Sequence, residues 1–290
     1  MSRIHEALQR AGREQNAVEN GKAVSPGRSL TVPIPGENLL TLKAIDIEKV
    51  ATYPWSPSLT YLPTLGDRGE SIEQFRSLRS RVYEFHLQNP LKTIVVSSGM
   101  PGEGKTFVAA NLAISLARNK NQRVLLIDGD LRRPSLHGIL GASATPGMSE
   151  YLTGAADLAE IIQRNEPSGA GASEGSRAFP NLSFIPAGKD SDASAEFLAS
   201  YRVEEMVAAL SAHFTWIIID SPPALVFADA IDLARTADAV LLVARGASTP
   251  YDVAQRTQAA FGSSRILGFV LNAVRNPPTT GSYYYYGHKR

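Results

Sequence analysis

Short, nearly pure apolar runs recur along the chain from residue 93 onward. They are rich in valine and isoleucine, do not alternate apolar with polar residues, and are too short to be buried helices. Strands that are buried on both faces have this pattern, which is typical of parallel sheets. The runs span residues 93–98, 123–130, 182–187, 216–223, 239–245 and 268–274.

Helical patterns separate most of these runs. One helix is expected before the first run, because Ile72, Phe75, Leu78, Val82 and Phe85 recur at spacings of three and four residues. Further helices are expected over residues 104–118, 196–212, 228–236 and 250–261. The repeated strand–helix alternation predicts an α/β fold with a doubly wound, mostly parallel sheet flanked by helices.

The two ends of the chain lack this alternation. Near the start, Ile4, Ala7, Leu8 and Ala11 form an amphipathic helical stripe, which suits either packing on the chain's own domain or docking on another protein. A proline-containing stretch without a sustained period follows, and the last residues are rich in glycine, proline and tyrosine. The expected parts are an N-terminal amphipathic helix (1–18), a linker (19–68), the folded domain (69–276) and a flexible tail (277–290).

Composition limits the possible functions. The chain is 43% hydrophobic and 20% charged, which suits a globular protein, and its net charge of +1 gives no reason to expect a nucleic-acid partner. It has no cysteine, and its five histidines lack the spacing of a zinc site. The first residues have no apolar segment of a secretory signal, and no apolar run approaches the ~20 residues of a membrane span. We therefore expect a cytoplasmic protein.

The stretch "SSGMPGEGKT" predicts a phosphate-binding loop. Gly99, Gly104, Lys105 and Thr106 fit the pattern G-x-x-x-x-G-K-[ST], between an expected strand and an expected helix. Glycines let successive backbone N–H groups point at phosphate oxygens, and the helix adds its positive end. Lys105 supplies a positive charge, and the hydroxyl of Thr106 is suited to Mg²⁺. The sequence therefore predicts nucleotide binding.

Three acidic residues follow two of the expected strands. Asp128 and Asp130 end the run at 123–130, and Asp220 ends "WIIID". Carboxyl ends of parallel strands meet at the crevice where ligands bind, so these acids are expected to hold Mg²⁺ or accept a proton. The alternative is ordinary acids of strand-ending turns. The motifs leave hydrolysis and transfer to a hydroxyl both open.

With "GMPGEGKT", "LLIDGDLRRP" and "IIIDSPPAL", the chain resembles the bacterial protein-tyrosine kinases, the P-loop BY-kinases, over about residues 70–286. The opening "SRIHEALQRA" is similar to a subgroup associated with exopolysaccharide and exosortase systems. The resemblance implies a P-loop NTPase fold, ATP and Mg²⁺ as cofactors, and tyrosine autophosphorylation that regulates exopolysaccharide or capsule synthesis and export.

Site residues follow from the motifs and the resemblance. Asp128, Asp130 and Asp220 would surround the metal and the incoming tyrosine together with Lys105; either Asp128 or Asp130 would accept the proton. The metal would lie at Thr106, Asp128 and Asp220. Asn272 resembles the asparagine that related ATPases use to read adenine, although a buried polar residue is the alternative. The expected nucleotide-binding residues are Gly99, Pro101, Gly102, Glu103, Gly104, Lys105, Thr106, Phe107, Arg132 and Asn272.

The C-terminal tyrosine run matches the tyrosine cluster of this family. The expected phosphate acceptors are Tyr283, Tyr284, Tyr285 and Tyr286. Glu73, Arg76 and Arg79 match the family motif E-x-x-R-x-x-R, which implies a ring-shaped homo-oligomer and delivery of each tail to a neighbour. A solvated helix face with ion pairs is the alternative.

The resemblance also implies partners. These are a membrane polysaccharide co-polymerase or chain-length activator on a separate chain, which would recruit the protein to the bacterial inner membrane, and further phosphotyrosine proteins and a phosphatase. Two rival functions remain. A positioning ATPase of the ParA/MinD type shares the P-loop, but it typically carries a lysine where this chain has Met100. A nucleotide-gated scaffold of a polysaccharide export complex would need no tyrosine acceptor.

Overall fold

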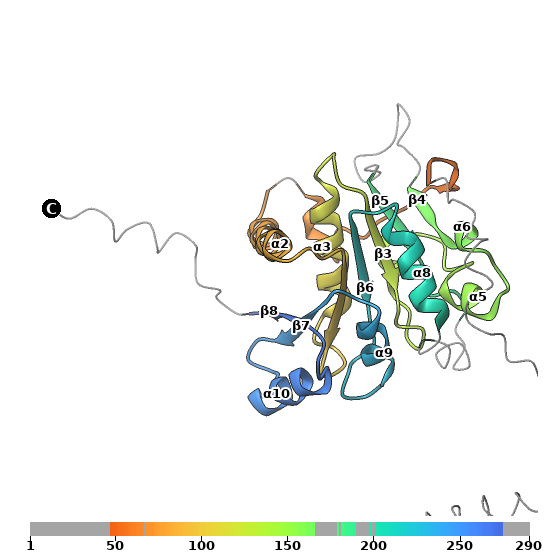
Figure 1. The fold of residues 1–290 in the computed structure, drawn as a ribbon. Coiled ribbons are helices and arrows are strands. Elements are labelled where there is room, and N and C mark those ends of the chain that lie inside the picture. The colour runs from red at the N-terminus through yellow and green to blue at the C-terminus, as the bar shows by residue number, and fades with distance from the viewer. Residues whose placement is uncertain are drawn as a thin grey trace, which may run out of the picture. The chain divides into compact units, whose positions relative to one another are not determined.

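The protein is represented by a computed structural model, which describes residues 47–66, 68–165, 179, 181–189, 198 and 201–274. Its centre is an eight-stranded sheet in the order β1-β4-β5-β3-β6-β2-β7-β8 (Figure 1). Every neighbouring pair is parallel except β4 with β5. The strands are β1 (Thr52–Tyr53), β2 (Thr93–Ser98), β3 (Val124–Asp128), β4 (Gln163–Asn165), β5 (Leu182–Ile185), β6 (Trp216–Asp220), β7 (Ala239–Arg245) and β8 (Ile266–Asn272).

Helices cover both faces of the sheet. The helices α2 and α3 share one apolar core with one face, while α5, α6 and α8 pack on the other face, and α9 and α10 cover that other face at β7 (Figure 1). The described helices are α2 (Glu70–Gln88), α3 (Lys105–Ala117), α4 (Leu136–Leu140), α5 (Met148–Thr153), α6 (Leu158–Ile161), α8 (Tyr201–Ser211), α9 (Asp229–Arg235) and α10 (Tyr251–Ala260). Short 3₁₀ turns span Ile47–Lys49 and Pro63–Leu65.

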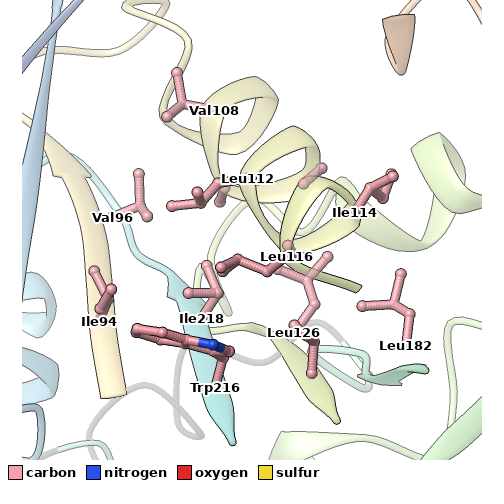
Figure 2. Close-up of a cluster of buried hydrophobic side chains, with 14 of the residues drawn as sticks. Ile94, Val96, Val108, Leu112, Ile114, Leu116, Leu126, Leu182, Trp216 and Ile218 are labelled. Carbon is pink, nitrogen blue, oxygen red and sulfur yellow. The ribbon is translucent and has the colours of Figure 1, made fainter. Parts of the chain in front are cut away.

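Successive residues of the central strands point to opposite cores. On β6, Trp216 and Ile218 face α3, whereas Ile217 and Ile219 face the core that includes α8 (Figure 2). The same alternation explains why these strands read as continuous apolar runs, since both faces are buried. Every residue of β2, β3 and β6 is buried.

The expected doubly wound, mostly parallel fold is confirmed. The strands at 93–98 and 239–245 have the expected bounds, and the others differ by a few residues at their ends. The short antiparallel strand β4 was not expected, because its sequence QRN is polar. It is nevertheless part of the sheet: the side chain of Gln163 exchanges hydrogen bonds with the backbone of Ser143, and Asn165 accepts one from the N–H of Trp55.

Residues 47–66 differ from the expected linker. Trp55, Leu62 and Leu65 are buried in the core beside α3. The hydroxyl of Thr64 donates to Asn111 Oδ1 at 2.6 Å, and the guanidinium of Arg118 donates to the carbonyl of Thr64. An irregular segment buries apolar residues without any helical or strand period, which is why the sequence pattern did not reveal it. The expected helix at 1–18 and the tail at 277–290 lie outside the described residues.

Candidate active site

The loop between β2 and α3 has the backbone that phosphate binding requires. Gly102 and Gly104 have φ angles of 80° and 97°, a region that favours glycine, and Gly104 immediately precedes the 13-residue helix α3. The loop and the first turn of the helix can therefore direct backbone N–H groups at an anion. Lys105 and Thr106 are the first two residues of that helix, as the motif predicted.

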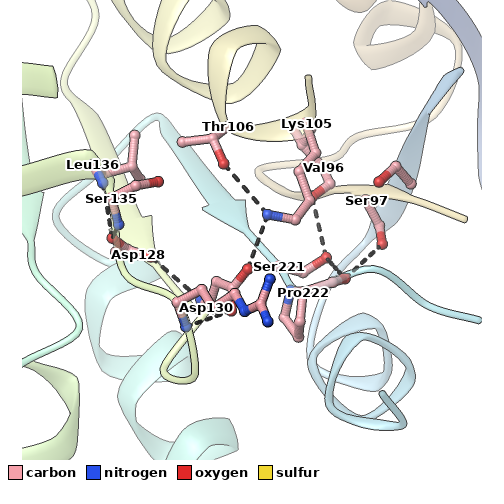
Figure 3. Close-up of polar contacts among 12 residues, drawn as sticks. Val96, Ser97, Lys105, Thr106, Asp128, Asp130, Ser135, Leu136, Ser221 and Pro222 are labelled. Carbon is pink, nitrogen blue, oxygen red and sulfur yellow. Dashed lines mark hydrogen bonds and ion pairs between the residues drawn. The ribbon is translucent and has the colours of Figure 1, made fainter. Parts of the chain in front are cut away.

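The structure brings the expected acids together beside this loop. Asp128 ends β3, Asp220 ends β6, and the two are register partners on adjacent strands. The ammonium group of Lys105 lies 2.9 Å from Asp130 Oδ2 and 3.4 Å from the Thr106 hydroxyl (Figure 3). Asp128 and Asp220 are fully buried. Two strand ends and a helix start thus converge on one charged cluster.

Burial and repulsion between carboxylates shift Asp128 and Asp220 toward their protonated forms. Desolvation, followed by the charge of Asp220, raises the pKa of Asp128 to about 8, although the backbone N–H groups of Leu136 and Ser135 oppose the shift. Desolvation also raises the pKa of Asp220 to about 6, against the charge of Lys105 and the nearby Thr106 hydroxyl. The ionised forms of these two acids are therefore unfavourable side by side, and a nearby cation would favour them.

The same cluster favours the charged form of Lys105. Burial by itself lowers the pKa of Lys105, but the charges of Asp220 and Asp130 outweigh it, so that the net shift is upward. Asp130 holds the lysine in this position and also accepts the backbone N–H of Arg133. Lys105 is therefore a permanent cation at neutral pH, which suits an electrostatic partner of phosphate.

A family comparison agrees with this geometry. The sequence profile of the CobQ/CobB/MinD/ParA nucleotide binding domain matches residues 94–284. The chain belongs to this family. The matched residues include the P-loop and the two acids that end strands, Asp128 and Asp220. Membership of this family implies that the domain binds a nucleotide.

Comparison with individual proteins points to tyrosine kinases within this family. The chain is 29% identical to the tyrosine-protein kinase YwqD of Bacillus subtilis, over 75% of this chain and 86% of YwqD. It is 30% identical to the tyrosine-protein kinase ptk of Acinetobacter johnsonii, over 80% of this chain but only 32% of that protein. The solved kinase domain of the Escherichia coli tyrosine kinase ETK superposes with a TM-score of 0.63 at 27% identity, covering 80% of this chain and 92% of that domain.

The site of this CobQ/CobB/MinD/ParA family member fits a metal-bound nucleotide. Neither carboxylate oxygen of the buried Asp220 has a hydrogen-bond partner of good geometry within the described ranges, which is costly without a cation. Nor do those ranges hold any group of three or more His, Cys, Asp or Glu residues suited to binding a metal alone. Mg²⁺ typically uses one or two carboxylates plus phosphate oxygens, so Asp220 and Thr106 would hold it together with the nucleotide.

Other predicted residues take different places. Arg132 forms an ion pair of 2.7 Å with Asp229 and lies over the ring of Phe227. The ring of Phe107 packs against Phe75 in the core rather than in the loop. On α2, the exposed Arg76 pairs with Glu73, whereas Arg79 donates to the carbonyl of Ser115 in its own chain. The tyrosines Tyr283 to Tyr286 lie outside the described residues.

Sequence reasoning missed the residues that contact the loop from outside. The hydroxyl of Thr249 donates to the Glu103 carboxylate, and Arg245 Nη1 donates to the carbonyl of Gly102 at 3.1 Å. Thr249 and Glu103 are separated by 146 positions, so no local spacing connects them.

The helices within the described ranges are all too short or too polar to span a bilayer.

Proposed function

We propose that the chain is an ATP- and Mg²⁺-dependent protein-tyrosine kinase that phosphorylates its own C-terminal tyrosine cluster in trans. The observation that carries the proposal is the convergence of the buried acids Asp128 and Asp220 with Lys105 at the P-loop. The kinase names of the relatives support the reaction class. Bound Mg²⁺-ATP would supply the γ-phosphoryl group for transfer.

In this proposal Asp128 accepts the phenol proton of the incoming tyrosine. A carboxylate whose pKa is raised to about 8 is a stronger base than an ordinary carboxylate, so the ionised form of Asp128 is suited to accept a phenol proton. Asp130 is less suited, because the ammonium group of Lys105 lies 2.9 Å from one of its oxygens. Lys105 offsets charge on the phosphates, and Asp220 and Thr106 orient the metal.

Chain length alone does not decide between delivery in cis and in trans. The tail follows β8, which lies three strands from β6 and Asp220, a separation of about 15 Å across the sheet. Nine residues of chain, from Val274 to Tyr283, could reach at most about 30 Å. The trans proposal therefore rests on the oligomer motif of α2, and it needs a direct test.

Mixing a variant that lacks the active-site lysine with one that lacks the acceptor tyrosines tests delivery between subunits. One variant carries Lys105→Met with the native tail, and the other carries Tyr283–Tyr286→Phe with a native site. We expect phosphotyrosine to appear on the Lys105→Met chain only in the mixture with Mg²⁺-ATP, as mapped by mass spectrometry. Tyr251→Phe, a change at a tyrosine with 78% exposure outside the tail, is the matched control and should leave phosphorylation unchanged.

The alternatives give different outcomes in the same experiment. Robust ATP hydrolysis with an unmodified tail would favour a positioning ATPase. Phosphorylation that the native chain performs but the mixture does not would place transfer within one chain. If the quadruple phenylalanine variant incorporates as much phosphate as the native protein, the tail is not the acceptor.

Assembly in this proposal uses the exposed face of α2. The side chains of Glu73 and Arg76 are 62% and 44% exposed and form an i,i+3 pair, which contributes only a few tenths of a kcal/mol within one helix. Arg76→Glu should therefore reduce oligomer size and tail phosphorylation with little loss of stability, as measured by light scattering. Arg235→Ala breaks a similar i,i+3 pair on α9 and should leave both unchanged. Equal oligomer size for both variants would contradict the proposal.

The biological setting is proposed from the family resemblance. The kinase would regulate exopolysaccharide or capsule synthesis and export, and a membrane co-polymerase or chain-length activator on a separate chain would recruit it to the inner membrane. Further phosphotyrosine proteins and a phosphatase would share this setting. Recovery of the full-length protein in inner-membrane fractions of its native cells would support recruitment, and recovery solely in the soluble fraction would contradict it.

A further inference from the structure

Side-chain hydrogen bonds hold the backbone of the P-loop in place, both from within the loop and from outside it. Glu103 is 5% exposed, and its carboxylate accepts the N–H of Met100 at 2.8 Å and the hydroxyl of Thr249. The Thr249 hydroxyl in turn accepts the N–H of Arg245 at 2.8 Å, which leaves its proton directed at Glu103. The connection from β7 to α10 is thereby tied to the centre of the loop.

Asn272, the last residue of β8, contacts the same part of the loop. Its side-chain amide donates to the carbonyl oxygen of Glu103 at 2.9 Å, and its own carbonyl accepts the N–H of Gly246 at 2.7 Å. The amide occupies the space beside Gly104, where an added Cβ would lie only 1.9 Å from Asn272 Nδ2. The glycine of the motif is therefore needed for this contact as well as for its positive φ angle.

A hydrogen bond that holds a backbone carbonyl group also sets the direction of the N–H group in the same peptide. In a trans peptide the C=O of one residue and the N–H of the next point in opposite directions. Arg245 holds the carbonyl of Gly102, and Asn272 holds the carbonyl of Glu103. The N–H groups of Glu103 and Gly104 are consequently turned away from these side chains. They are the groups that a phosphate-binding loop presents to its anion.

We propose that Glu103, Thr249 and Asn272 form a clamp that positions the P-loop for phosphate. They are positioning residues rather than catalytic ones, because their side chains bond to the loop or to one another and not to the reacting groups. The inference assigns Asn272 to the phosphate end of the nucleotide instead of the adenine base. It requires only nucleotide binding and is independent of tyrosine as the acceptor.

If the clamp positions the loop, weakening it should lower the affinity for every phosphate-containing ligand, whichever base the ligand carries. For Asn272→Ala and Thr249→Val, we expect Kd to rise about tenfold for Mg²⁺-ADP, Mg²⁺-GDP and Mg²⁺-pyrophosphate alike, the scale of one lost hydrogen bond. Isothermal titration calorimetry on the full chain measures all three. Thr249→Ser keeps the hydroxyl and should restore binding. Thr236→Val removes a hydroxyl that bonds only within the end of α9 and should have no effect.

Each other outcome overturns the inference. If Asn272→Ala weakens ADP while GDP and pyrophosphate bind as before, Asn272 reads the base. If Thr249→Val binds all three ligands with native affinity, the clamp does not position the loop. Should Asn272→Ala fail to fold, as checked by thermal melting, the isosteric Thr249→Val and its serine rescue decide the question. No phosphotyrosine readout enters the test, so failure of the proposed kinase activity would appear separately.

Discussion

Lys105→Met is expected to reduce tyrosine phosphorylation at least about a thousandfold, the scale of losing a preorganised electrostatic group in an active site. The native Lys105 side chain is 14% exposed, and its ammonium group lies 2.9 Å from Asp130 Oδ2. Without it, Asp128, Asp130 and Asp220 would face the incoming phosphates with no adjacent lysine, so that repulsion opposes both binding and transfer. The initial rate of phosphotyrosine formation with Mg²⁺-ATP measures the effect.

A second lysine on the same stretch provides the control. Lys120 follows the end of α3 and is exposed, and Lys120→Met changes the net charge by the same amount. We expect this variant to keep the native rate. Phosphorylation of the tail by Lys105→Met at a rate within a few fold of native would contradict the assignment of the site.

Asp220→Asn is expected to make the ligand-free protein more stable while abolishing phosphoryl transfer. The folded carboxyl binds its proton more tightly than the unfolded one, because burial raises its pKa from 3.8 to about 6. The native protein therefore loses stability as the pH rises through this window. At pH 8 the uncharged variant avoids that loss, and its free energy of unfolding should be larger by about 1–3 kcal/mol.

Thermal melting near pH 8 and near pH 4 checks the direction of this change in stability. The advantage of Asp220→Asn should be largest near pH 8 and shrink toward pH 4, because the folded carboxyl, with a pKa of about 6, is then protonated and uncharged. The same substitution at Asp238 should destabilise instead, since one of its oxygens accepts the N–H groups of Lys92 and Thr93. A lower melting temperature for Asp220→Asn at pH 8 would show that its charge is compensated in the free protein.

Much of the site was predictable because its parts are local in sequence. The P-loop is one contiguous motif, and Asp128 and Asp220 directly end apolar runs, so a parallel sheet brings them together by its own geometry. The contacts of Glu103 were not predictable, since Thr249 and Asn272 reach it from distant elements. No periodic pattern marks such a contact, which depends on the order of strands in the sheet.

The burial of the irregular segment before α2 was hidden for a related reason. Its prolines suggested a loosely attached chain, yet Pro63 begins a 3₁₀ turn that ends at the buried Leu65, and the preceding Leu62 is buried in the same core. Proline is compatible with the first position of such a turn, so its presence did not exclude ordered structure. The short helices α4, α5 and α6 are likewise too brief to produce a detectable amphipathic period.

The attachment of residues 47–66 to α3 bears on how the catalytic part is isolated for biochemistry. A fragment that starts at Gly69 would remove Trp55, Leu62 and Leu65 from the core that they share with α3 and leave an apolar surface facing water. Such surfaces drive self-association, so low solubility of that fragment would report a misplaced cut rather than an unstable enzyme. A cut upstream of Ile47 keeps β1 paired with β4 and leaves this surface covered.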